Sequence, residues 1–89
     1  MKEGIPVKAT IIVSSWFKRY TGGLSSLEQE LLEGETAWQA VCRAGIPAGD
    51  IGFVTVDGAG EDGRAKRVDD AYRAADGDVL RVYPLIIGG

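Results

Sequence analysis

The last two residues of the sequence, Gly88 and Gly89, carry its clearest capacity for chemistry. We expect Gly89 to hold the α-carboxylate, which is ionised at neutral pH and which no side chain on either residue shields. Glycine is favoured where a backbone takes an unusual dihedral angle or where another backbone comes very close, and a chain end needs no turn. The diglycine therefore indicates close approach to a partner, and we interpret it as a reactive carboxylate on a narrow stalk.

An apolar run, Leu85, Ile86 and Ile87, precedes the diglycine. Chain ends are often disordered unless they are held, so this run could fray or fold back onto the body of the protein. The alternative is insertion into a partner groove as an extended strand, where the main chain gives hydrogen bonds and the side chains give specificity. An apolar anchor beside a narrow tip favours insertion. We therefore expect Pro84 and the three apolar residues to dock on a partner, while residues 85–89 form a flexible tail.

The other candidate groups are poorly suited to catalysis. The sequence has no histidine, so it lacks the usual acid–base group of neutral pH and a usual zinc ligand. Its one cysteine, Cys42, lies on the apolar stripe of an expected helix, where free cysteine behaves as a small buried hydrophobe, and only Arg43 offers a nearby cation. No pair among the 13 acidic residues is spaced as a catalytic dyad. We expect no metal, no bound cofactor and no enzymatic activity, so that the protein is acted upon by an enzyme.

Charge and hydropathy narrow the range of partners and locations. A net charge of −3, with ten basic residues spread along the chain, argues against nucleic acid, which needs a concentrated basic surface. Four glutamates fall between Tyr20 and Cys42 without an intervening Lys or Arg, namely Glu28, Glu30, Glu33 and Glu35. They could steer a basic partner, but we favour a solvated strand edge and helix start. The short apolar runs, and a start without a secretory signal core, predict a cytoplasmic protein without a membrane span.

The length of 89 residues suits one domain, 1–89, which begins with two strands. Apolar and polar residues alternate from Val7 onwards, which is the pattern of a half-buried strand, and we expect this strand over 6–16. A glycine pair and polar residues predict a connecting loop over 17–25. Alternation resumes over 26–32, so the two strands should pair as an antiparallel hairpin.

A helix is predicted over 36–45. Thr36 and Gln39 have the spacing of a capping box, in which each side chain satisfies a backbone N–H at the helix start. Gly45 and Pro47 are typical of a helix end, since glycine suits the last turn and proline cannot continue it. The expected apolar stripe, which would dock on the sheet, consists of Trp38, Val41 and Cys42.

A third strand is predicted over 51–57 and a short, cationic edge strand over 64–68. The segment between them, Gly58–Gly63, has the glycine spacing of a dinucleotide-binding loop. We reject that interpretation because no helix with an apolar face follows, and because acidic residues inside the loop would repel a pyrophosphate. The acidic residues also lack the spacing of a calcium-binding hand, so we expect a plain surface loop.

The remaining residues predict a short helical turn over 71–75, a turn at Asp76-Gly77-Asp78, and a last strand over 79–83. Pro84 lacks an N–H and should end the hydrogen-bond ladder of that strand. The expected order is therefore strand, strand, helix, strand, strand, strand.

This element order and the ending from Asp76 to Gly89 resemble the ThiS/MoaD sulfur-carrier family of ubiquitin-like, β-grasp proteins. The likeness spans the whole chain and is most specific in the Asp-Gly-Asp turn, the strand after it, Pro84 and the terminal Gly-Gly. It implies an α+β fold of the β-grasp class, with a mixed sheet of four to five strands and one main helix packed on one face.

The resemblance also implies a function. A ubiquitin-activating-type adenylating enzyme would use ATP and magnesium to adenylate the carboxylate of Gly89, and a sulfur donor would convert the product to a thiocarboxylate. An acyl-adenylate offers sulfur a good leaving group, and the thiocarboxylate is itself a nucleophile that can pass sulfur to an accepting synthase. The last two residues of the tail, Gly88 and Gly89, would enter the partner active site, and a Cβ at either position should obstruct their entry.

Several outcomes stay open within this resemblance. The acceptor could belong to molybdenum or tungsten pterin cofactor biosynthesis, which Pro84 slightly favours, or to thiamin biosynthesis. A ubiquitin-like modifier joined to lysines through Gly89, or an interaction module of the β-grasp fold without tail chemistry, are the alternatives. The sequence departs from the simplest family members in the loops at 17–25 and 58–63, either of which could alter partner choice.

Overall fold

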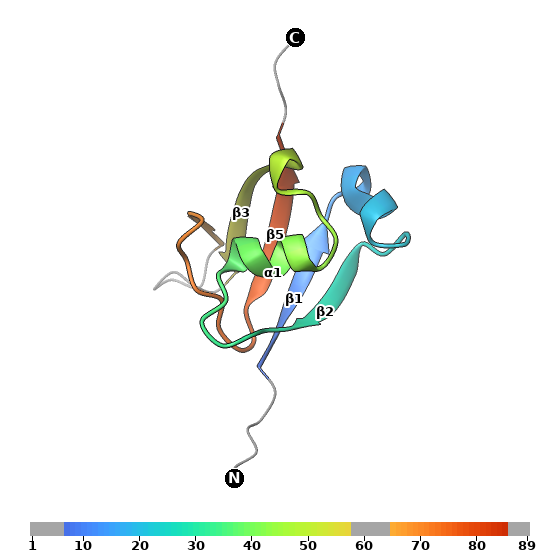
Figure 1. Cartoon of the computed structure of the whole chain (residues 1–89). Helices are drawn as coiled ribbons and strands as arrows, with labels where there is room; N and C mark the ends of the chain where they lie inside the picture. Colours follow the sequence, from blue (N-terminus) through green and yellow to red (C-terminus); the bar gives the residue numbers. More distant parts are fainter. Residues whose placement is uncertain (1–6, 58–64, 86–89) are drawn as a thin grey trace.

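Five strands form one mixed sheet, and the main helix covers one of its faces (Figure 1). The computed structural model describes residues 7–57 and 65–85. The sheet order is β2-β1-β5-β3-β4, with β1 at Lys8–Val13, β2 at Ser26–Glu30, β3 at Ile51–Asp57, β4 at Lys66–Val68 and β5 at Val79–Pro84. The helices of the described residues are α1 at Ala37–Arg43 and two short 3₁₀ helices, η1 at Ser15–Tyr20 and η2 at Ala48–Asp50. This α+β arrangement agrees with the predicted class and is compatible with a β-grasp.

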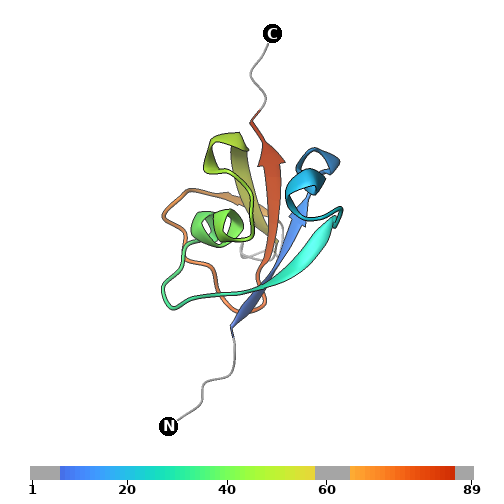
Figure 2. The same ribbon diagram turned by 45° about the vertical axis from the view of Figure 1, so that its right-hand side comes forward.

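The strand pairing determines which segments lie at the same end of the sheet. The predicted hairpin is confirmed, because β1 and β2 are antiparallel, while β1 and the central strand β5 are parallel. Parallel neighbours finish at the same edge of a sheet. The helix η1, which follows β1, therefore lies at the same end of the molecule as the end of β5, as both ribbon views show (Figure 2).

The core lies between the sheet and α1. Alternate side chains of the strands point to this side and are buried, including Ile11 of β1, Val54 of β3 and Leu80 of β5. The opposite set, which includes Ile12, Thr55 and Arg81, occupies the face that α1 does not cover and is half-buried. The period-two pattern therefore predicted the two faces of the sheet correctly.

The predicted caps of the helix are confirmed. The Thr36 hydroxyl accepts from the Gln39 N–H, and the Gln39 side chain accepts from the Thr36 N–H. Gly45, just past the helix end, has φ of 116°, which a residue with a side chain rarely adopts. The most buried helix residues are Ala37, Ala40 and Val41, whereas Trp38 and Cys42 of the predicted stripe are only partly buried.

The first strand is shorter than predicted. It ends at Val13, and the predicted strand end and loop contain η1 instead. The chain turns after Ser14, and within η1 the Phe17 side chain is fully buried in the core. The Phe17 N–H donates to the Ser14 carbonyl at 3.0 Å, and this bond holds the first turn.

The helical turn predicted over 71–75 is wrong. A turn at Asp70 and Ala71, in which the Tyr72 N–H donates to the Asp69 carbonyl at 3.2 Å, is followed by an isolated antiparallel bridge between Arg73 and Thr36. The Ala74 N–H donates to the Glu35 carbonyl at 3.0 Å, and the Ala37 N–H donates to the Tyr72 carbonyl at 2.9 Å. The Tyr72 carbonyl and the Ala74 N–H are thus bonded to the segment that leads into α1, and not within a helical turn.

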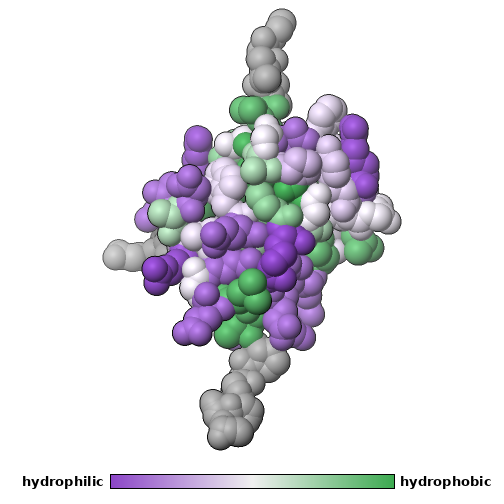
Figure 3. All heavy atoms as spheres, in the orientation of Figure 1, coloured by the Kyte–Doolittle hydropathy of each residue, from purple (hydrophilic) through white to green (hydrophobic). Residues whose placement is uncertain are grey.

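Other predictions near the end of the chain are confirmed. Asp76 and Gly77 form a turn in which Gly77 has φ of 85°, and β4 pairs with β3 as a short edge strand. The loop at 58–63 lies outside the described residues. Within the described ranges, no helix is long and apolar enough to cross a membrane. On the face that carries α1, hydrophilic residues cover the middle, and apolar residues lie both where β5 finishes and toward the opposite end of the molecule (Figure 3).

Candidate functional site

The described part of the predicted docking segment is the end of β5. Pro84 is half-buried and is the last residue of the strand, which thus runs one residue beyond the predicted 79–83. Leu85 follows with 52% of its surface exposed. The other predicted site residues, Ile86, Ile87, Gly88 and Gly89, lie outside the described residues. The contacts described below are therefore those that hold Pro84 and Leu85, just before these residues.

Gly52 allows the end of β5 to lie unusually close to β3. The pairing of β3 with β5 is irregular between Ile51 and Phe53, which is the signature of a bulge. A Cβ placed on Gly52 would lie 2.6 Å from the carbonyl oxygen of Pro84 and 3.1 Å from the Cα of Leu85. Since real side chains do not come this close to backbone atoms, only glycine fits here. Gly52 thus fixes the path of the chain at the exit from the sheet.

A second contact holds the same point from η2. The Leu85 N–H donates to the Asp50 carbonyl at 2.9 Å, and the Asp50 carboxylate accepts from the Tyr20 hydroxyl at 2.9 Å. This hydrogen bond to Asp50 is the main cause that raises the pKa of Tyr20, so the phenol stays protonated and remains a donor. Asp50 therefore connects η1, η2 and the end of β5.

Pro84 occupies a position where its missing N–H breaks no bond. The Thr10 N–H donates to the Asp78 carbonyl, so even-numbered residues of β5 turn their backbone groups toward β1. Val82 pairs with Val13, the last residue of β1, and β5 continues beyond it. Pro84 consequently faces a side where no described strand is present. A hollow of about 240 Å³ lies between the end of β1 and the neighbouring part of β5, lined by Ile12, Val13, Ser14, Arg81, Val82 and Tyr83.

The uncovered sheet face carries aromatic and cationic side chains near the same exit. The rings of Phe53 and Tyr83 are stacked with centroids 4.5 Å apart, and the guanidinium carbon of Arg67 lies 4.8 Å from the Phe53 centroid. Next to them, Arg81 Nε donates to the Asp57 carboxylate at 3.1 Å. These contacts stiffen the last part of β5 on the side opposite the core.

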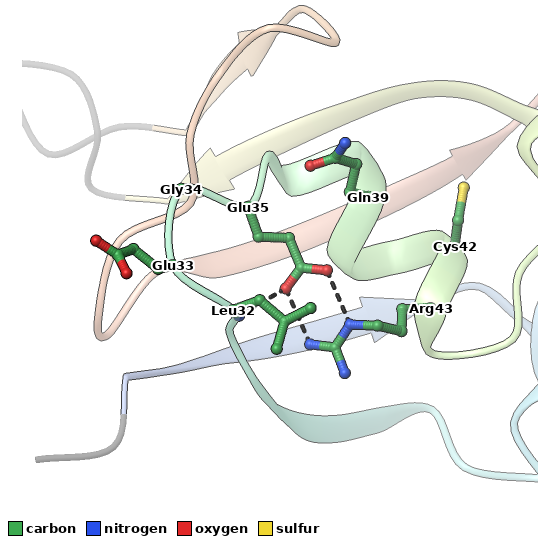
Figure 4. Close-up of a pocket in the computed structure, with 7 residues that line it drawn as sticks. All are labelled: Leu32, Glu33, Gly34, Glu35, Gln39, Cys42 and Arg43. Atoms are coloured by element: carbon green, nitrogen blue, oxygen red, sulfur yellow. Dashed lines mark hydrogen bonds and ion pairs between the residues drawn. The ribbon is translucent and has the colours of Figure 1, made fainter. Parts of the chain in front are cut away.

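A second candidate site is a hollow of about 420 Å³ beside α1 (Figure 4). Glu35 lies at its base with 6% of its surface exposed, which corrects the prediction that all four glutamates are solvated. Its Oε1 accepts from the Leu32 N–H at 2.9 Å, and Arg43 donates to both carboxylate oxygens at 2.8 and 2.9 Å. Arg43 also donates to the Glu30 carbonyl. The hydrogen bonds from Arg43 lower the pKa of Glu35, while the same contact raises the pKa of Arg43.

Cys42 lines this hollow together with Gln39. The thiol is half-buried rather than fully buried, and burial raises its pKa. A raised pKa keeps the sulfur protonated at neutral pH, and thiols of that kind are poor nucleophiles. Because Glu35 and Arg43 bond to each other and to the backbone, the arrangement serves to join the end of β2 to α1 rather than to activate a ligand.

Within residues 7–57 and 65–85, no group of three or more His, Cys, Asp or Glu side chains is placed to hold a metal ion. A scan against models of known protein families gives no match, and no curated protein matches the sequence. The candidate functional site is thus defined by the geometry at the end of β5.

Three residues of this site were missed by sequence reasoning: Gly52, Asp50 and Tyr20. Only Gly52 leaves a signal, because an isolated glycine inside an apolar strand suggests a bulge or a close backbone contact. The contacts of Asp50 join segments that are far apart in the sequence, so no local pattern reveals them.

Proposed function

We propose that the protein is a sulfur carrier of the β-grasp fold, in which the carboxylate of Gly89 is adenylated by a partner enzyme and converted to a thiocarboxylate. The observation that carries the proposal is the fixed exit of β5. Gly52 and Asp50 hold Pro84 and Leu85, and the Gly-Gly ending follows within a few residues. A carrier needs a firmly held base and a narrow end, because a partner must place the acyl carbon accurately.

The chemistry needs few groups from the carrier. A carboxylate oxygen of Gly89 attacks the α-phosphorus of ATP and pyrophosphate leaves, which gives an acyl-adenylate. A hydrosulfide equivalent from the sulfur donor then attacks the acyl carbon, AMP leaves, and the thiocarboxylate forms. Magnesium and the catalytic groups belong to the adenylating enzyme. The carrier supplies a tail without side chains, which fits a closed site where water is excluded from the hydrolysable intermediate.

The proposed acceptor of the sulfur is a synthase of cofactor biosynthesis. Pro84 at the end of β5 favours molybdenum or tungsten pterin synthesis, and thiamin thiazole synthesis is the second choice. The proposed location is the cytoplasm, where the adenylating enzyme and ATP are found.

The first step is tested by ATP–pyrophosphate exchange. The protein is incubated with labelled pyrophosphate, ATP, magnesium and the ubiquitin-activating-type enzyme of the same host. We expect exchange that depends on the carrier and that a Gly89→Val substitution abolishes, because a side chain next to the reacting carboxylate blocks the channel. A chain that lacks residues 88–89 should also be inactive. Exchange that is equally fast without the carrier, or with the truncated chain, would contradict the proposal.

A further inference from the structure

The helix η1 presents an aromatic and cationic cluster to the surface. Trp16 is 55% exposed, and the guanidinium carbon of Arg19 lies 4.9 Å from the centroid of a Trp16 ring and 5.8 Å from that of Tyr20. Lys18 is exposed beside them. Phe17, between these residues, is fully buried and anchors the helix in the core. The cluster is therefore held in place, and a partner would pay little ordering entropy to bind it.

This cluster lies at the end of the molecule from which the tail leaves. Tyr20 donates to the Asp50 carboxylate, and the Asp50 carbonyl accepts from the Leu85 N–H, so two hydrogen bonds link η1 to the end of β5. In both ribbon views η1 stands beside the end of β5 (Figures 1 and 2). An enzyme that receives the tail must approach this end. It would therefore meet the exposed side chains of η1 and Leu85 together.

The charges of the chain are unevenly placed along the sheet. Glu30 pairs with Lys8 at the start of β1, and Asp76 and Asp78 form the turn that leads into β5, so these acids lie at the end opposite to the tail exit. The exit end carries two cations, Lys18 and Arg19, and one carboxylate, Asp50, which accepts from the neutral Tyr20 hydroxyl. Among the described residues, the charge near the exit is thus more positive than the net charge of −3 for the chain indicates.

We propose that Trp16, Lys18, Arg19 and Leu85, here called the exit surface, form the docking site for an acidic surface of the adenylating enzyme. This inference rests on the proposed function. Exposed Trp and Arg side chains are the types that contribute most to binding energy at interfaces. Complementary charge would steer the carrier so that its tail points into the enzyme. A symmetric dimer through the exit surface is disfavoured, because Lys18 and Arg19 would face the same residues of a second copy.

The test measures KM and kcat for the carrier in the exchange reaction with the same enzyme. Lys18→Glu, Arg19→Glu and Trp16→Ala should each raise KM by about tenfold, which corresponds to one lost interface contact. The kcat should stay close to that of the wild type, because the tail is unchanged. Lys66→Glu is the matched control, since Lys66 is an exposed lysine on β4 away from the exit, and its KM should not change.

Salt gives a second readout. The KM of the wild type should rise with ionic strength, and that of Arg19→Glu should rise less, because the variant lacks one of the charge contacts that screening weakens. Equal urea midpoints for all variants show that folding is intact.

Each failure has a distinct meaning. If the wild type supports exchange but the exit variants keep its KM, or if Lys66→Glu has the same effect as Lys18→Glu, the docking proposal is wrong and the carrier function stands. If sedimentation shows a wild-type dimer that Trp16→Ala dissociates, the occupant is a second copy and the proposal is also overturned. If the wild type supports no exchange, both the carrier function and the docking site fail.

Discussion

The end of β5 leaves a side chain exposed on a firmly held backbone, whereas the hollow beside α1 has its charged groups already bonded within the protein. At the end of β5 the backbone is held firmly, by Gly52 and by the carbonyl of Asp50, while Leu85 is exposed. In the hollow, the charged groups of Glu35 and Arg43 bond to each other and to neighbouring backbone. A site that acts on another molecule needs groups that are positioned but still available. By this measure we propose the end of β5, rather than the hollow beside α1, as the functional region.

The largest effect is expected from a substitution of Gly52, which lies beside the end of β5 and not in the hollow. Gly52→Val would place a side chain within 2.6 Å of the Pro84 carbonyl oxygen, so the end of β5 must move. We expect unfolding in urea to show a loss of about 2–3 kcal/mol, which is typical of overpacking against backbone. In the exchange assay, the same displacement should lower the activity of the carrier.

Gly49→Ala is the matched control, because a Cβ at Gly49 would meet nothing within 4 Å. Its stability and exchange activity should stay close to those of the wild type. If Gly52→Val were as stable and active as Gly49→Ala, the close approach between β3 and β5 would not matter for the exit of the tail.

The next effect tests whether the hollow is structural. Glu35→Gln replaces an oxygen that accepts from Arg43 with an amide nitrogen, so two donors would face each other. We expect a loss of about 1–2 kcal/mol in urea unfolding, in keeping with an unsatisfied buried group. The exchange activity of the folded variant should not change. A clear loss of exchange activity at unchanged stability would instead give the hollow a direct role in the reaction.

The ion pair of Glu35 and Arg43 should also make the free energy of unfolding depend on pH. Because Arg43 lowers the pKa of Glu35 from its ordinary value of 4.5, ionised Glu35 stabilises the folded state fully above that value. This contribution is lost as the pH falls through the lowered pKa of the folded state. Urea unfolding between neutral pH and strongly acidic pH should therefore show a smaller acid loss in Glu35→Gln than in the wild type. Parallel pH curves for the two proteins would argue against the pKa shift.

The smallest effect concerns the uncovered face of the sheet. Arg67→Gln removes the guanidinium that lies over Phe53, in an exposed setting where such contacts contribute about 0.5–1 kcal/mol. Urea unfolding should show a loss in this range, and Lys66→Gln serves as the control on the same strand. A loss as large as that of Gly52→Val would mean that β4 has a greater part in holding β5 than the contacts suggest.

Local chemistry made much of the fold predictable. The capping box of Thr36 and Gln39, the glycine after the helix and the alternation in the strands each depend on neighbours in the sequence. The end of the last strand near Pro84 was also predicted, although the missing N–H of Pro84 breaks no bond in the ladder to β3.

What could not be predicted depends on distant partners. Phe17 of η1 packs its ring into the core, and Tyr72 and Ala74 form hydrogen bonds with the segment that leads into α1. No local pattern in the sequence indicates either contact. Glu35 looked like one more solvated glutamate, yet Arg43, on the last turn of α1, brings it into the interior. At the candidate site, Pro84 and Leu85 were predicted to take part in docking, whereas the contacts from Gly52 and Asp50 that hold them were not predicted.

The most direct test of the central claim is the intact mass of the protein after incubation with ATP, magnesium, the adenylating enzyme and a sulfide donor. The account predicts a mass increase equal to the exchange of one oxygen for sulfur, absent in the chain that lacks residues 88–89. Denaturing gels of the same reaction in a host extract should show no ladder of lysine-linked products. An unchanged mass, or conversion into lysine-linked conjugates without a thiocarboxylate, would contradict the account.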